Sequence, residues 1–142
     1  MVENILVPVD DSDPATDALD YAVENYPDAR ITALHVVNPS EWGTGLSIEG
    51  AATYTDMLEA HESRAEEFLE EMSERAAERG VSVETEYVVG EVARSIVEYV
   101  DEHDIDHVVI GSHGRSGATR VLLGSTAESV TRRSQVPVTV IR

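Results

Sequence analysis

Short apolar segments and segments with helical periodicity alternate along the chain. Continuous apolar runs of four to seven residues are typical of strands covered on both faces, whereas apolar residues three and four apart indicate amphipathic helices. Five strands are expected, over residues 5–9, 31–37, 81–89, 107–110 and 136–141. Four helices are expected between them, over residues 13–26, 54–80, 93–100 and 125–133.

Strands that alternate with helices predict right-handed crossovers and a parallel sheet. Residues 81–89 alternate apolar and acidic positions, which is typical of an edge strand with one wet face. Pro137 cannot donate to a ladder, so it either lies on an edge strand or begins its strand. The sequence therefore predicts a single doubly wound α/β domain over residues 1–142. Its five-stranded parallel sheet has the order 3-2-1-4-5, with helices on both faces.

The connections of this sheet indicate where a ligand binds. Ligands of doubly wound sheets bind at the carboxyl ends of the strands where the strand order reverses, here between the first and fourth strands. Residues 10–12 and 111–125 lie there. Asp13 and Pro14 are expected as N-cap and first residue of the first helix. Residues 39–53 carry three glycines and no clear period, which predicts a binding loop or lid.

Composition excludes several classes of protein. The 142 residues include no Cys and no Lys, which excludes disulfides, Cys-based zinc sites, Schiff-base chemistry and a P-loop. No basic leader and no long apolar run is present, so a cytoplasmic domain with no membrane partner is expected. The net charge of −18 disfavours binding to nucleic acid and to anionic membranes. Acidic residues in excess, with Arg as the only fixed cation, favour a halophilic protein over a merely acidic one.

The charge is unevenly distributed. Residues 111–142 hold five Arg and one acidic residue, Glu128, whereas residues 1–110 hold 27 acidic residues and five Arg. An anionic ligand is therefore expected on the last part of the chain.

One motif in that part fits a phosphate. Gly111, Gly114 and Gly124 let the backbone turn with positive φ or approach a ligand, and Ser125 stands where a helix begins. Arg115 and hydroxyl groups add donors. The alternative is a capping box in which Ser125 bonds the Glu128 N–H and the glycines only shape a loop. The residues leave both interpretations open.

The spacing Gly-x2-Gly-x9-Gly-Ser after a strand resembles the nucleotide-binding signature of the ATP-binding branch of the universal stress protein family. The resemblance covers the whole chain, from residues 7–12 and 34–37 through Gly90 and residues 109–117 to the closing residues 136–141. It implies a cytoplasmic stress-response switch that binds ATP, ADP or AMP. It also implies a homodimer formed through Val136–Ile141. Slow or negligible hydrolysis is expected from the residues themselves, because there is no Lys and no evident general base.

The family resemblance also implies a set of nucleotide-binding residues. Asp10 is similar to the acid that contacts adenosine, with an N-cap of the first helix as the alternative role. Val36 resembles the residue whose backbone meets adenine. The remaining nucleotide-binding residues implied by the resemblance are Pro8, Val9, Gly111, His113, Gly114, Arg115, Gly124, Ser125 and Thr126. A Mg ion bound through phosphates and water is consistent with this set, with no metal held by the protein alone.

The other polar residues give weaker signals. The five histidines lack metal-site spacing, and His61 is expected to pack in the core. Asp104, Asp106 and His107 favour a solvated turn over a cation site. No catalytic residue is expected, because no general base faces a γ-phosphate. Two alternatives stay open: an ATP-consuming enzyme of the wider α/β superfamily and a nucleotide-free dimeric scaffold.

Overall fold

The computed structural model describes residues 2–41, 51–112 and 123–142, and the side chains from residue 54 onward in the second of these ranges. The strands are β1 (Asn4–Pro8), β2 (Arg30–Val37), β3 (Val83–Val89), β4 (His107–Gly111) and β5 (Val138–Ile141). The helices are α1 (Asp13–Asn25), the 3₁₀ turn η1 (Pro39–Glu41), α2 (Ala51–Ala77), α3 (Val92–Glu102) and α4 (Ser125–Arg133). No helix in the described ranges is both long and apolar enough to cross a bilayer.

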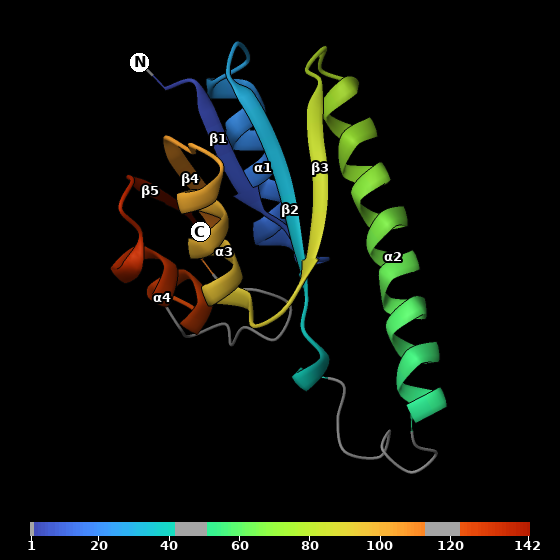
Figure 1. The fold of residues 1–142 in the computed structure, drawn as a ribbon. Coiled ribbons are helices and arrows are strands. Elements are labelled where there is room, and N and C mark those ends of the chain that lie inside the picture. The colour runs from blue at the N-terminus through green and yellow to red at the C-terminus, as the bar shows by residue number, and fades with distance from the viewer. Residues whose placement is uncertain (1, 42–50, 113–122) are drawn as a thin grey trace.

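The strands form one parallel sheet in the order β3-β2-β1-β4-β5, which confirms the predicted fold and the switch point between β1 and β4 (Figure 1). The central strands β1 and β4 are buried almost throughout, as their continuous apolar runs predict. The acidic strand β3 lies at one edge and β5 at the other, as predicted from the Glu alternation and from Pro137. Residues 10–12 and 111–112 therefore follow neighbouring strands.

Two apolar cores cover the two faces of the sheet. Alternate residues of β1 divide between them: Ile5 and Val7 pack with α1 and α2, whereas Leu6 packs with α3 and α4. Helix α2 runs alongside β2 and β3 and continues past their carboxyl ends (Figure 1). Its first turns are therefore placed beside the predicted ligand edge.

Three boundaries differ from the sequence predictions. Ser12, not Asp13, is the N-cap of α1, because its Oγ accepts a hydrogen bond from the Ala15 N–H at 3.3 Å. Helix α2 begins at Ala51, so the segment predicted as loop up to residue 53 ends earlier. Strand β5 begins at Val138, directly after Pro137, because the ladder needs N–H groups that proline lacks.

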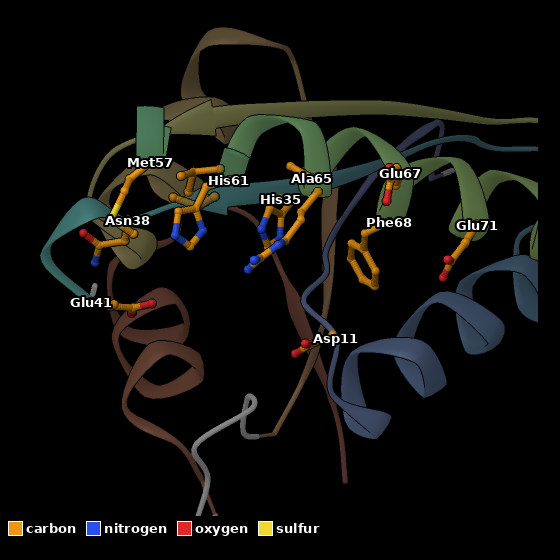
Figure 2. A pocket seen from close by; sticks show the side chains of 13 residues that line it. Asp11, His35, Asn38, Glu41, Met57, His61, Ala65, Glu67, Phe68 and Glu71 are labelled. Carbon is orange, nitrogen blue, oxygen red and sulfur yellow. The ribbon is translucent and has the colours of Figure 1, made fainter. Parts of the chain in front are cut away.

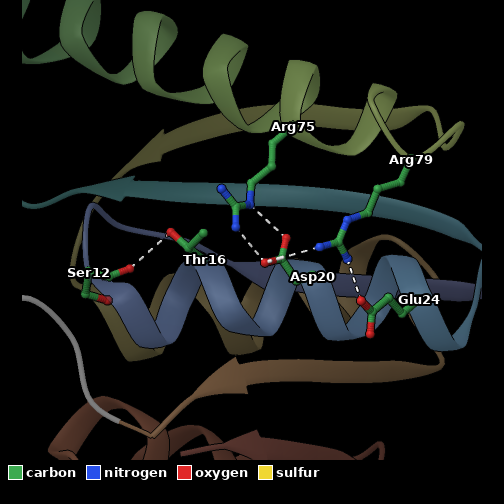
Figure 3. A network of polar contacts seen from close by, with 6 residues as sticks. All are labelled: Ser12, Thr16, Asp20, Glu24, Arg75 and Arg79. Atoms are coloured by element: carbon green, nitrogen blue, oxygen red, sulfur yellow. Dashed lines mark hydrogen bonds and ion pairs between the residues drawn. The ribbon is translucent and has the colours of Figure 1, made fainter.

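A group of ion pairs joins α1 to α2 (Figure 3). Arg75 bonds the Asp20 carboxylate through both Nε (2.8 Å) and Nη2 (2.7 Å), and Arg79 bonds Glu24 at 2.8 Å. The hydrogen bond from Arg75 lowers the pKa of Asp20 below its usual 3.8. A carboxylate with a lowered pKa stabilises the fold at neutral pH, and its contribution is lost as the pH falls below the ordinary Asp range.

The turn before β4 links two neighbouring strands. Asp106 accepts hydrogen bonds from the Glu3 N–H (3.1 Å) and the Asn4 N–H (2.8 Å), and so joins the starts of β4 and β1. Asp104 has a φ of 53°, which Asp tolerates better than most residues. No group of three metal-ligating side chains occurs in the described ranges. Asp104 and Asp106 are both exposed, as expected of the solvated turn that the sequence favours.

Candidate functional site

Helix α4 begins at the switch point with a glycine as its N-cap. Its N-cap is Gly124, which makes no side-chain cap hydrogen bond, and Ser125 is the first helical residue. The Glu128 N–H bonds the Gly124 carbonyl at 2.9 Å, and the Glu128 carboxylate bonds Arg132 at 2.9 Å. The capping box considered from the sequence is therefore wrong. The amides of Ser125, Thr126 and Ala127 point out of the helix, where the dipole favours an anion.

Ser112 joins α4 to the end of the sheet. Its carbonyl accepts from the Gly124 N–H at 2.5 Å, and its N–H donates to the Ile141 carbonyl at 2.7 Å. Ser112 itself is buried. The start of α4 is thereby held directly beside the carboxyl ends of β4 and β5. His113, Gly114 and Arg115, which the resemblance adds to the site, lie outside the described residues.

Position 111 requires a glycine because of a packing contact that the sequence does not reveal. A Cβ added to Gly111 would lie 2.7 Å from the Pro14 carbonyl carbon and 2.9 Å from the Pro14 Cβ. Neither Gly111 nor Gly124 has a positive φ, so a left-handed turn is not the reason for either glycine. Gly111 instead lets the end of β4 pack against the first turn of α1.

The β1–α1 turn places the first predicted group of site residues. Pro8 and Val9 are buried, and Asp10 is half-buried at the carboxyl end of β1. The Asp10 Oδ1 accepts from the Ser12 N–H at 2.9 Å. Asp10 is therefore not the N-cap of α1, which is Ser12. Asp10 lies in the β1–α1 turn, and β1 has β2 on one side and β4 on the other.

Val36 presents both backbone polar groups toward the end of β1. The Val9 N–H bonds the Leu34 carbonyl at 2.8 Å, so Leu34 and Val36 face β1, while Val37 faces β3 and accepts from the Gly90 N–H at 2.9 Å. In the described ranges no backbone bond joins the Val36 N–H to the Val9 carbonyl. That carbonyl lies 2.9 Å from the His35 Nδ1. The Val36 N–H and the Val36 carbonyl therefore form a donor and an acceptor side by side at the end of β2.

A groove of about 960 Å³ opens beside this edge, between β2, α2 and Asp11 (Figure 2). Such a volume suits a small organic ligand. His35 and Phe68 pack edge to face in it, with ring centroids 5.7 Å apart. Four carboxylates and one guanidinium line it: Asp11, Glu41, Glu67, Glu71 and Arg64. This excess of negative charge disfavours a phosphate in the groove.

The groove residues on α2 were not predicted as site residues. His61 was expected in the core, but it is half-buried and lines the groove together with Met57. A helical pattern shows which residues share a face, but it does not show that the helix continues past the sheet. The only signal in the sequence is polar His61 and Arg64 on the otherwise apolar side of the helix.

The parallel sheet, with the start of α4 beside its switch point, defines a doubly wound α/β domain. The model of the universal stress protein family matches residues 1–142, and the chain belongs to this family.

Solved structures of the family share the fold along the whole chain. Universal stress protein UspA from Lactobacillus plantarum is 32% identical with a TM-score of 0.85, over 99% of this chain and 98% of that one. A universal stress protein solved in complex with cAMP is 26% identical with a TM-score of 0.74, covering 99% and 97%. The Archaeoglobus fulgidus protein, solved in complex with dAMP, is 25% identical with a TM-score of 0.66, covering 100% and 98%.

Proposed function

We propose that this chain binds an adenine nucleotide across the carboxyl ends of β1, β2 and β4. The observation that carries the proposal is the start of α4, where the N-cap Gly124 supplies no side-chain cap and Glu128 is turned toward Arg132. Nucleotides in two solved relatives, cAMP and dAMP, support the same ligand class. In the cell, bound ATP, ADP or AMP would make the protein a stress-response switch.

The two ends of the proposed site differ in charge, and this difference orients the ligand. The acidic groove beside Val36 suits the uncharged base, and the Val36 N–H and carbonyl match the N1 acceptor and the amino donor of adenine. The start of α4 suits the phosphates, through the amides of Ser125 and Thr126. Asp10 lies between them, where the ribose would pass. His113, Gly114 and Arg115 would add contacts to the ribose and the phosphates.

The side chains at this edge indicate how a metal ion would be held and whether ATP would be hydrolysed. A Mg ion would be held by phosphate oxygens and water, since the described residues supply no metal-binding group of three side chains. The chain has no lysine, and β4 ends in Gly111 and not in an acidic residue. We therefore propose a binding protein of the cytoplasm with slow or negligible ATP hydrolysis.

Comparison of AMP with IMP tests how the base is read. IMP replaces the amino donor of adenine with a carbonyl acceptor and N1 with an N–H, so both groups mismatch Val36. Calorimetry should show AMP binding about 10- to 100-fold tighter than IMP, the value of one or two mismatched hydrogen bonds. Ribose 5-phosphate is the control and should bind more weakly than either. Equal affinity for AMP and IMP would exclude Val36 as the reader of the base.

A second proposal concerns the solvent. The net charge of −18 with no lysine supports a protein that works at high salt, as in a halophile. Raising KCl from 0.1 M to about 2 M shortens the Debye length to roughly 2 Å and screens self-repulsion among carboxylates. The melting temperature should then rise by about 10 °C or more. In a variant with Glu66→Gln, Glu70→Gln and Glu74→Gln, KCl should raise the melting temperature by less. A melting temperature that does not depend on KCl would contradict the proposal.

A homodimer through Val136–Ile141 stays part of the proposal. In the described ranges β5 pairs with β4 alone, so its outer edge presents unpaired backbone groups. Its four residues are all half-buried. A second copy paired along this edge would cover them.

A further inference from the structure

The Val9 carbonyl has an unusual partner. In a regular parallel ladder, a residue that donates to the carbonyl of one residue accepts from the N–H two positions further along. Val9 donates to Leu34 at 2.8 Å, so its carbonyl should accept from the Val36 N–H. The partner that the structure gives this carbonyl is instead the imidazole Nδ1 of His35, at 2.9 Å.

From this exchange of partners we infer that His35 is a positioning residue that keeps the backbone edge of Val36 open for a ligand. The inference rests on the proposed function only for the nature of the ligand, an adenine base. The state of the Val36 edge is a property of the chain without ligand.

The chemistry of the ring fixes the direction of this bond. A carbonyl oxygen can only accept, so Nδ1 carries the proton and donates, in the neutral ring as well as in the charged one. The remaining nitrogen, Nε2, is then an acceptor when the ring is neutral. Protonation of His35 leaves the bond to Val9 in place.

Packing from α2 holds the ring in this position. Phe68 meets the ring edge to face at a centroid distance of 5.7 Å, and both side chains line the groove (Figure 2). His35 is therefore fixed from β1 through its hydrogen bond and from α2 through Phe68. The ring lies between the last backbone hydrogen bond of the β1–β2 pair, from Val9 to Leu34, and the groove.

Removal of the ring N–H changes which group satisfies the Val9 carbonyl. A carbonyl this close to the core costs free energy when it is left unpaired. The nearest regular donor is the Val36 N–H, and this bond would extend the ladder by one rung. The Val36 N–H would then no longer be available to an adenine base.

Hydrogen exchange at the Val36 amide tests the inference directly. His35→Phe keeps a ring against Phe68 but removes the donor. In the ligand-free protein, the Val36 amide of His35→Phe should exchange at least about 10-fold more slowly than in the wild type, as expected of a newly bonded amide. AMP affinity should fall by a similar factor. The Gly90 amide, bonded to Val37, is the internal control and should exchange equally in both proteins.

A rescue variant separates this role from a merely structural one. In His35→Asn, the side-chain amide places an N–H close to the position of Nδ1, so fast Val36 exchange and AMP affinity should both return. His35→Leu serves in place of His35→Phe if the latter does not fold. Equal Val36 exchange in the wild type and the donor-free variant would overturn the inference. Slowed exchange in a protein whose wild type binds no AMP would uphold it and overturn the proposed function instead.

Discussion

Ser125→Glu should lower the affinity for AMP by about 100-fold while it leaves the melting temperature unchanged or slightly raised. A carboxylate at the first position of α4 competes with the phosphate for the outward amides, and like charges in contact cost several kcal/mol in binding. The same carboxylate interacts favourably with the helix dipole, by about 0.3–1 kcal/mol, so the fold is not weakened. Calorimetric titration and thermal melting measure the two effects separately.

Two control variants make this result specific. Ser82→Glu adds the same charge at an exposed position before β3, at the opposite end of the parallel sheet, and should leave AMP affinity nearly unchanged. Ser125→Ala removes only the hydroxyl and should cost less than about 10-fold, because backbone amides carry the interaction. If Ser125→Glu bound AMP as tightly as the wild type, the phosphates could not lie at the start of α4.

Gly111→Ala should destabilise the fold by about 1–3 kcal/mol, the usual cost of overpacking a well-packed contact. The added Cβ would lie within 3.0 Å of three Pro14 atoms, two of them in the backbone, and a helix start cannot move as a single side chain does. Urea unfolding followed by circular dichroism measures the loss.

Gly90→Ala is the matched control for this substitution. Its added Cβ meets one atom, the Ser95 hydroxyl oxygen at 2.7 Å, which can move away by rotation about a single bond. Gly90→Ala should therefore cost clearly less than Gly111→Ala. Equal losses for the two variants would contradict the role assigned to the Pro14 contact.

The strand order could be predicted because each strand carries a signal of its own environment. Continuous apolar runs mark β1 and β4 as central, and the Glu alternation of β3 and the proline before β5 mark the edges. These signals depend on local residues, so they need no knowledge of distant contacts. The start of α4 at Ser125 could be predicted for the same reason, from Gly124 and the helical pattern after it.

The details that distinguish the site could not be predicted in this way. Ser125 and Glu128 have the spacing of a capping box, but Arg132, one turn further on, binds the Glu128 carboxylate instead. From the sequence Gly111 is interpreted as a turn glycine, whereas the structure shows that its lack of a Cβ makes room for Pro14. The bond between His35 and Val9 joins residues 26 positions apart and has no pattern in the sequence. Each depends on which of several possible partners the folded chain brings close.

An amide-resolved NMR titration with AMP tests most directly whether the nucleotide lies across the switch point. The amides of Ser125, Thr126 and Ala127 should shift together with that of Val36, and all should saturate with one affinity. Amides at the opposite end of the sheet, such as that of Asn4, should stay unchanged. Saturable binding that moves neither the start of α4 nor Val36 would contradict this placement of the ligand.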